Sequence, residues 1–241
     1  MKTFRKSSLI TSVALLLVAI VALGGATFAW FSTNNSATAG TLEMTATSAS
    51  GLYIAETALE GTAPETGWSS KITWTDNVDS MPAVSGNASA PTAFFKTSTD
   101  NADGTWNGTD AISAANANTD FIVKKIWVKA DTSDEVTLTI TPTVAAGEGE
   151  GKAMKGYERI AIVDDNGAVI MSNAEETYEA FTSQAGAVEE ITTETFGAQT
   201  YTGKLDTAKC FYVYMWFEGQ DAECYNLNSG ANFKLDLAFA I

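Results

Sequence analysis

Alternation of apolar and polar residues is the sequence feature that most constrains the fold of this chain. In the segment 135–144, Val136, Leu138 and Ile140 alternate with threonines, and the last ten residues, 232–241, alternate in the same way. A period of two residues places apolar side chains on one face of a strand and polar side chains on the other, as in a half-buried antiparallel sheet. Both segments are therefore predicted to be strands, and the second holds the C-terminal residues in a sheet.

Shorter stretches rich in β-branched and aromatic residues predict further strands. They are 41–48, 51–55, 70–74, 92–96, 121–130, 157–163, 168–171 and 210–217. Asn166-Gly167 lies between two of these stretches and favours a hairpin with a type I′ turn. A helix is expected only at 173–181, as a short connector with Asn173 as its N-cap. Apart from the stretch 92–96, the segment 85–120, rich in Asn, Ala and Ser, is expected to be a long loop or a decorated crossover between strands.

The number and length of these strands indicate an all-β fold. We expect residues 30–241 to form one antiparallel β-sandwich of the jelly-roll or Greek-key kind, with long loops and at most short helices. An N-terminal signal helix would precede this domain. Neither a repeat of fixed period nor a linker divides the segment 30–241.

Residues 1–29 have the composition of a secretory signal peptide. Lys2, Arg5 and Lys6 precede a long apolar run, and small residues end the segment at Ala29. The run is also about long enough to span a bilayer, which takes roughly 20 residues, so an uncleaved membrane anchor is the alternative. Because the segment holds three basic residues and no acidic ones, the chain after it carries 11 basic and 29 acidic residues and a net charge of −18.

The junction at residue 29 resembles the N-terminus of the TasA/camelysin family of exported proteins. The resemblance lies in the segment 24–32, which reads Gly-Gly-Ala-Thr-Phe-Ala-Trp-Phe-Ser, and in the segment 37–44, which reads Ala-Thr-Ala-Gly-Thr-Leu-Glu-Met. In that family a dedicated, SipW-type signal peptidase of Gram-positive bacteria removes the leader. The resemblance therefore implies cleavage between Ala29 and Trp30.

The same resemblance implies a function. TasA-like proteins are secreted subunits of extracellular biofilm-matrix fibres, in which the N-terminal segment of one subunit completes the sandwich of the next. Here the donor segment would be 30–40, with Trp30 and Phe31 as its apolar anchors. We therefore expect a secreted or cell-surface structural protein of a Gram-positive bacterium. It would form a homo-oligomer or filament, with matrix or cell-wall components as further partners.

Composition and charge narrow the alternatives. The chain has no histidine, which excludes His-based zinc sites and Ser-His-Asp or Cys-His catalysis. The absence of histidine also argues against a camelysin-like secreted protease. We therefore expect no catalytic residue, no metal and no cofactor. A net charge of −15 argues against nucleic-acid binding, which needs clustered basic residues. Membrane contact is expected only through the signal segment before cleavage.

Cys210 and Cys224 are the only cysteines of the chain. In an exported protein such a pair suggests a disulfide, and two buried thiols are the alternative. The segment 100–104, Asp-Asn-Ala-Asp-Gly, has the oxygen-rich spacing of a calcium loop but lacks the acidic twelfth residue of an EF-hand. An Asx-rich turn is the simpler interpretation.

Tryptophans suggest a second possible function. Trp68, Trp74 and Trp106 lie in or near predicted loops, and exposed aromatic rings commonly stack on sugars. A surface adhesin or glycan-binding module is therefore the alternative to a fibre subunit, although most aromatic residues of a sandwich belong to its core.

Overall fold

The computed structural model of the chain describes the residues that form its β-sheets and several of their connections. They are 42–49, 51–76, 84–87, 90–96, 111–112, 117–146, 154, 156–174, 191, 193–219, 221, 223–224 and 233–241. The leader, the cleavage site at Ala29 and Trp30, and the donor-strand candidates Trp30 and Phe31 lie outside these ranges and stay predictions. So do the calcium-like segment 100–104, Trp106, and most of the predicted helix 173–181.

Strands make up all the regular structure in the described ranges, which contain no helix and so none that could cross a membrane. They are β1 (Leu42–Ser48), β2 (Leu52–Thr57), β3 (Lys71–Asp76), β4 (Val84–Asn87), β5 (Ala90–Lys96), β6 (Ala111–Ile112), β7 (Ile122–Ala130), β8 (Glu135–Ala146), β9 (Glu158–Asp164), β10 (Val169–Ser172), β11 (Thr193–Thr195), β12 (Gln199–Lys204), β13 (Lys209–Phe217) and β14 (Phe233–Ala240). The predicted all-β class is confirmed, and every predicted strand is present within a few residues of its expected bounds.

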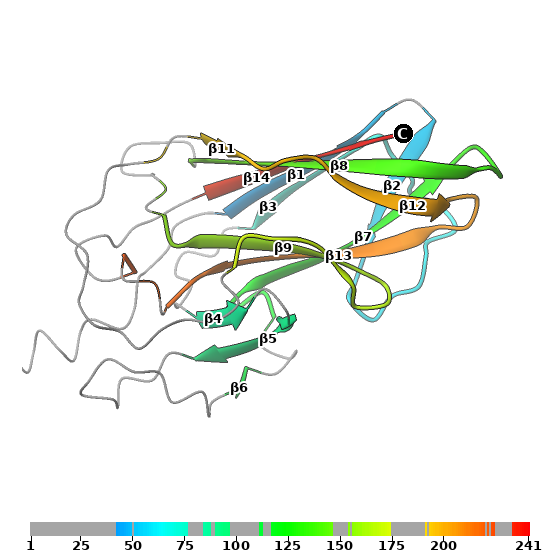
Figure 1. Cartoon of the computed structure of the whole chain (residues 1–241). Helices are drawn as coiled ribbons and strands as arrows, with labels where there is room; N and C mark the ends of the chain where they lie inside the picture. Colours follow the sequence, from blue (N-terminus) through cyan, green and yellow to red (C-terminus); the bar gives the residue numbers. More distant parts are fainter. Residues whose placement is uncertain are drawn as a thin grey trace, which may run out of the picture.

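Two sheets pack face to face as a β-sandwich (Figure 1). Sheet A has the order β11-β8-β14-β1-β3, and β12 also pairs with β8. Sheet B has the order β10-β9-β13-β7-β2, and all its pairs are antiparallel.

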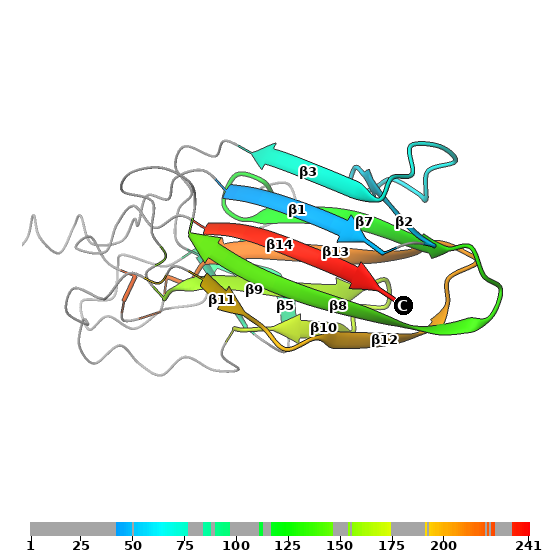
Figure 2. The same ribbon diagram turned by 90° about the horizontal axis from the view of Figure 1, so that it is seen from above.

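One pair of sheet A departs from the predicted antiparallel arrangement. β1 pairs with β14 in parallel, from Glu43 opposite Lys234 to Ser48 opposite Phe239 (Figure 2). Local alternation predicts a strand but not its neighbour, so this pairing of the first and last strands could not be predicted. As a consequence β1 is an interior strand, flanked by β14 on one side and β3 on the other.

Alternate residues of both sheets fill the space between them. From sheet A, Leu235, Leu237 and Phe239 of β14 point inward and are buried, as are Phe211 and Val213 on β13 of sheet B. The rings of Phe211 and Phe239 meet across the interface, with their centroids 6.5 Å apart. The alternation that predicted these strands therefore marks the core face correctly.

A third, smaller sheet covers part of the outer face of sheet B. β4, β5 and β6 form this sheet C, and Phe94 of β5 stacks on Phe121 at 4.1 Å and meets the edge of Trp216 at 5.1 Å. Figure 1 shows it as a separate layer below sheet B. The strand predicted at 92–96 is present as β5, but β4 and β6 lie where a loop or crossover is expected. These short strands pair with one another and bury an aromatic cluster. Residues 97–110 and 113–116 of the expected loop lie outside the described ranges.

The predicted hairpin of β9 and β10 forms, but its turn is not type I′. Gly167 has a φ of +80°, whereas Asn166 does not have a positive φ. The amides of Asn166 and Ala168 both donate to the Asp164 carboxylate, at 2.9 and 2.8 Å. This geometry fits a three-residue loop that ends in a left-handed glycine. The Asp164 side chain stabilises the loop by accepting hydrogen bonds from two of its backbone amides.

Candidate functional site

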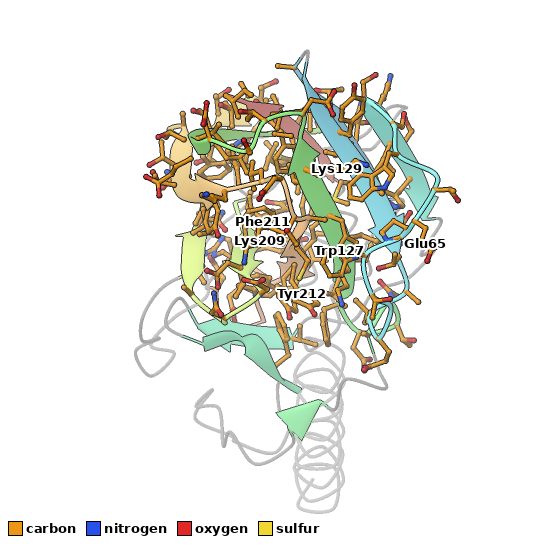
Figure 3. All side chains as sticks on the ribbon, turned by 90° about the vertical axis from the view of Figure 1, so that its right-hand side faces the viewer. Glu65, Trp127, Lys129, Lys209, Phe211 and Tyr212 are labelled. Carbon is orange, nitrogen blue, oxygen red and sulfur yellow. The ribbon has the colours of Figure 1, made fainter. Side chains whose placement is uncertain are left out.

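Sheet C leaves the other part of the outer face of sheet B uncovered by any described strand. The side chains there combine aromatic rings with lysines, and we call them the lysine–aromatic face: Tyr53, Trp68, Lys125, Trp127, Lys129 and Tyr212. Lys125 is buried and the others are half-buried. Figure 3 looks at this region along the sandwich and labels several of these residues.

Strand register places these side chains together. β7 lies between β2 and β13, so that Lys129 stands opposite Tyr53 and Lys125 stands opposite Tyr212. Trp127 lies in the row between them, with Ala55 and Cys210 as its cross-strand neighbours. Lys125, Trp127 and Lys129 alternate along one strand and so share a face as a local property of the sequence, but their partners on β2 and β13 depend on strand order.

Lys125 is held in place by its own contacts. Its Nζ donates to the carbonyls of Leu59 and Gly61, at 3.1 and 2.7 Å. It also lies 5.0 Å from the ring centroid of Trp127 and 5.3 Å from that of Tyr212. Cation–π contacts of this kind stabilise a partly desolvated ammonium. Lys125 therefore anchors the loop after β2 and orients two of the rings.

Lys129 lies at the other end of the face. Its Nζ is 4.3 Å from the ring centroid of Trp68 and 5.9 Å from that of Tyr53. Hydrogen bonds on both sides of Trp68 hold the loop that carries it. The Trp68 indole donates to the Pro64 carbonyl at 3.0 Å, and Ser69 pairs with Ile54 through two backbone hydrogen bonds. The aromatic surface beside Lys129 is therefore preorganised.

A carboxylate borders the face at Tyr53. The Tyr53 hydroxyl donates to Asp131 at 2.8 Å, and this hydrogen bond to the carboxylate raises the pKa of Tyr53. The indole of Trp127 donates to the Thr57 hydroxyl at 2.9 Å. The polar atoms of both rings therefore have partners within the protein.

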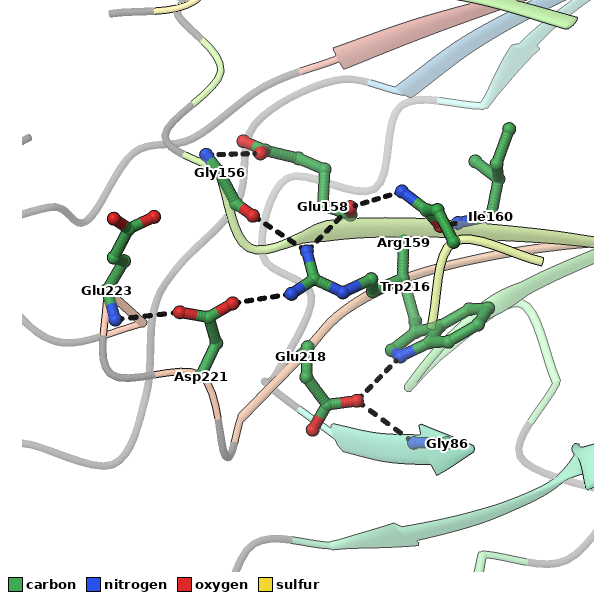
Figure 4. A network of polar contacts seen from close by, with 10 residues as sticks. Gly86, Gly156, Glu158, Arg159, Ile160, Trp216, Glu218, Asp221 and Glu223 are labelled. Carbon is green, nitrogen blue, oxygen red and sulfur yellow. Dashed lines mark hydrogen bonds and ion pairs between the residues drawn. The ribbon is translucent and has the colours of Figure 1, made fainter. Parts of the chain in front are cut away.

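A second group of polar side chains lies at the opposite end of sheet B (Figure 4). Arg159 is buried; its guanidinium donates to the carbonyls of Gly156 and Glu158 and forms an ion pair with Asp221. Asp221 in turn accepts a hydrogen bond from the amide of Glu223. Burial and the nearby Asp221 raise the pKa of Glu223, and Arg159 opposes this rise.

Glu218 connects this group to sheet C. It is fully buried and accepts hydrogen bonds from the indole of Trp216 at 3.0 Å and from the amide of Gly86 at 3.2 Å. A carboxylate with such donors is a structural link, because an ionised group needs hydrogen bonds when it leaves water. We assign this second group to the attachment of the small sheet and of the chain after β13.

A cavity of about 220 Å³ opens beside Arg159 at this end of the sandwich. Its lining includes the polar residues Glu158, Asn173 and Glu194 and the apolar residues Met154 and Phe196. In the described ranges, no three acidic or cysteine side chains are grouped so as to hold a metal ion.

The disulfide predicted between Cys210 and Cys224 is not formed; both are free, buried thiols. Cys210 is the second residue of β13. Cys224 lies beyond the far end of that strand, where its amide donates to the Asp221 carbonyl at 3.0 Å. The strand between Cys210 and Phe217 alone spans about 23 Å at roughly 3.3 Å per residue, whereas bridged Cα atoms lie within about 7 Å. Spacing in sequence gave no sign of this separation.

We expect both thiols to be unreactive in the native protein. Burial raises the pKa of Cys210, and it raises that of Cys224 well above its ordinary value, so little reactive thiolate forms at neutral pH. In urea without reductant, a thiol reagent should label both cysteines, and in the native state it should label them slowly. Labelling that requires prior reduction would contradict this expectation.

The tryptophans singled out in the sequence have different positions. Trp68 belongs to the lysine–aromatic face, as described. Trp74 does not lie on a loop: it is an inward-facing residue of β3, buried in the main core. The glycan-binding interpretation therefore keeps Trp68, loses Trp74 and gains Tyr53, Trp127 and Tyr212, while Trp106 lies outside the described residues and stays a prediction.

Comparison of the chain with protein-family models, with curated proteins and with solved structures gave no match.

Proposed function

We propose that the protein is an exported structural subunit that assembles by strand addition, with its N-terminal segment as the donor. The observation that carries this proposal is the open edge of β3 next to the interior strand β1. In the described ranges β3 pairs only with β1, on one side. An unpaired strand edge offers a row of N–H and C=O groups that an incoming strand can satisfy.

The backbone of β3 gives the acceptor edge a definite pattern. Ser48 N donates to the Ser70 carbonyl at 2.9 Å, so the backbone groups of Ser70 point toward β1. In an antiparallel ladder successive residues point to opposite sides. Ile72 and Trp74 therefore also bond toward β1, whereas Lys71, Thr73 and Thr75 point away from it. The N–H and C=O of Lys71 are already bonded to the Ser69 hydroxyl, at 3.1 and 2.9 Å. Thr73 and Thr75 therefore direct their N–H and C=O groups to the open edge.

The position of β1 supports the same proposal. β1 begins at Leu42, directly after the predicted donor segment 30–40, and it is fixed between two strands. An extended segment of about ten residues reaches roughly 33 Å, enough to lie along a neighbouring subunit. Trp30 and Phe31 would be its apolar anchors. Because subunits of net charge −18 repel one another, assembly should become faster as salt screens that repulsion.

Substitution at the acceptor edge tests this proposal. Thr73→Pro removes an N–H that points away from β1, and proline is tolerated on strand edges, so the fold should persist while filaments disappear from negative-stain micrographs. Thr73→Val is the matched control, because it keeps the N–H, and it should assemble normally. Deletion of residues 30–39 should abolish filaments in the same assay.

The outcomes separate the two halves of the proposal. Filaments of undiminished number in Thr73→Pro would exclude the β3 edge as the acceptor. Undiminished filaments after the deletion would exclude the N-terminal segment as the donor. A wild-type protein that stays monomeric at all salt concentrations would contradict the structural role itself.

A further inference from the structure

The lysine–aromatic face contains cations that have no acidic partner. The chain has 29 acidic and 14 basic residues, so a lysine would be expected to meet a carboxylate. In the part of the chain that the structure describes, however, no ion pair involves Lys125 or Lys129; their Nζ atoms lie over rings. Lys129 has no hydrogen bond of its own there, and its ammonium lies at the surface of a half-buried aromatic group.

The rings beside Lys129 are fixed before any ligand arrives. The indole of Trp68, which lies 4.3 Å from Lys129 Nζ, donates to the Pro64 carbonyl. The indole of Trp127, whose ring lies beside Lys125, donates to Thr57. Asp131 holds the Tyr53 hydroxyl. Rings that lose little conformational freedom on binding give more of their contact energy to affinity. The face is thus a rigid surface with aromatic area next to Lys129, whose ammonium has no hydrogen bond or ion pair among the described residues, unlike Lys125, which donates to two carbonyls.

We propose that this face binds an acidic polysaccharide built of uronic acid units. A hexuronate combines a pyranose ring, whose C–H face packs on an aromatic ring, with a carboxylate, which forms a charge-assisted contact with an ammonium. The rings of Trp68, Tyr53 and Trp127 take the sugar, and Lys129 takes the carboxylate. This binding is independent of strand addition, since β3 and the lysine–aromatic face belong to different sheets.

Charge distinguishes this ligand from the nearest alternatives. Duplex DNA carries one charge per about 1.7 Å and needs many basic contacts, which a chain of net charge −15 does not provide. A neutral glucan would stack on the rings but would leave Lys129 unmatched. A uronan carries one charge per sugar and matches an isolated lysine among aromatic residues.

Calorimetric titration of the purified full chain with polygalacturonate, and with amylose as the neutral polymer, tests the proposal. Polygalacturonate should bind, and its affinity should fall as the salt concentration rises. Amylose should bind much more weakly. Lys129→Gln should weaken polygalacturonate binding about tenfold, the scale of one charge-assisted contact. Lys234→Gln removes the same charge from the outer face of sheet A and should leave binding unchanged. Trp68→Ala should lose binding, and Trp68→Phe should retain most of it.

Each other result overturns the proposal. Absence of polygalacturonate binding excludes the ligand class. Equal affinity for amylose, unaffected by Lys129→Gln, means that the face recognises neutral glycans and not uronates. Equal losses in Lys129→Gln and Lys234→Gln mean that the polymer is attracted by surface charge alone. Melting temperatures of all variants within a few degrees of wild type show that a loss of binding is not a loss of fold.

Discussion

Leu237→Ala should lower the free energy of unfolding by about 2–5 kcal/mol. Leu237 lies on β14, which pairs with β8 and β1 in the middle of sheet A, and it is 1% exposed. Its side chain packs in the main core between the two sheets. Truncation removes buried methyl groups and leaves a cavity. The cavity cannot close, because pairing with β1 and β8 on both sides holds β14 in place. Urea denaturation followed by tryptophan fluorescence measures the change.

The next residue of the same strand supplies the control. Ala238 faces outward and is exposed, so Ala238→Thr should change stability by no more than about 0.5 kcal/mol. Its cross-strand neighbours are Thr47 and Thr141, which a threonine matches. If the two substitutions had equal effects, the inward and outward faces of β14, and with them the register of the last strand, would be assigned incorrectly.

Strands that bury alternate residues could be predicted from the sequence. Strands without such alternation could not be predicted. β14 and β8 alternate strictly, and both were found. β12 has a single aromatic residue, Tyr201, among polar ones, and all three residues of β11 are exposed. Both lie at the edge of sheet A and are held by pairing with β8. Their own sequences therefore carry little of the signal that determines their structure.

The candidate sites follow the same rule. Alternation along β7 placed Trp127, Lys125 and Lys129 on one face, which is a local property. Tyr53 and Tyr212 join them through pairing with β2 and β13, and Trp68 joins through a loop. The disulfide failed for a related reason: the two cysteines are close in sequence but separated by the length of an extended strand. Contacts that depend on strand order need the fold.

Arg159→Met should be about as damaging as the core truncation, with a loss of about 3–5 kcal/mol. Arg159 is 6% exposed. Its guanidinium forms an ion pair with Asp221 and donates to the Glu158 carbonyl. Without the guanidinium, the Gly156 carbonyl loses its donor and Asp221 keeps a charge that is only partly hydrated. Breaking one side of a buried pair costs more than the pair contributes.

A second substitution and a change of pH identify the cause of this loss. Arg159→Met combined with Asp221→Asn removes both charges and keeps the oxygen that accepts from Glu223, so it should recover part of the stability.

Removal of Arg159 should also raise the pKa of Glu223 further, because Arg159 now lowers it. A carboxyl whose pKa is higher in the folded than in the unfolded state costs stability above that pKa, and the cost disappears as pH falls. The deficit of Arg159→Met should therefore shrink between pH 7 and about pH 4, near the ordinary carboxyl pKa. A deficit that is equal at both pH values, with no recovery in the double variant, would mean that Arg159 acts through packing and not through charge.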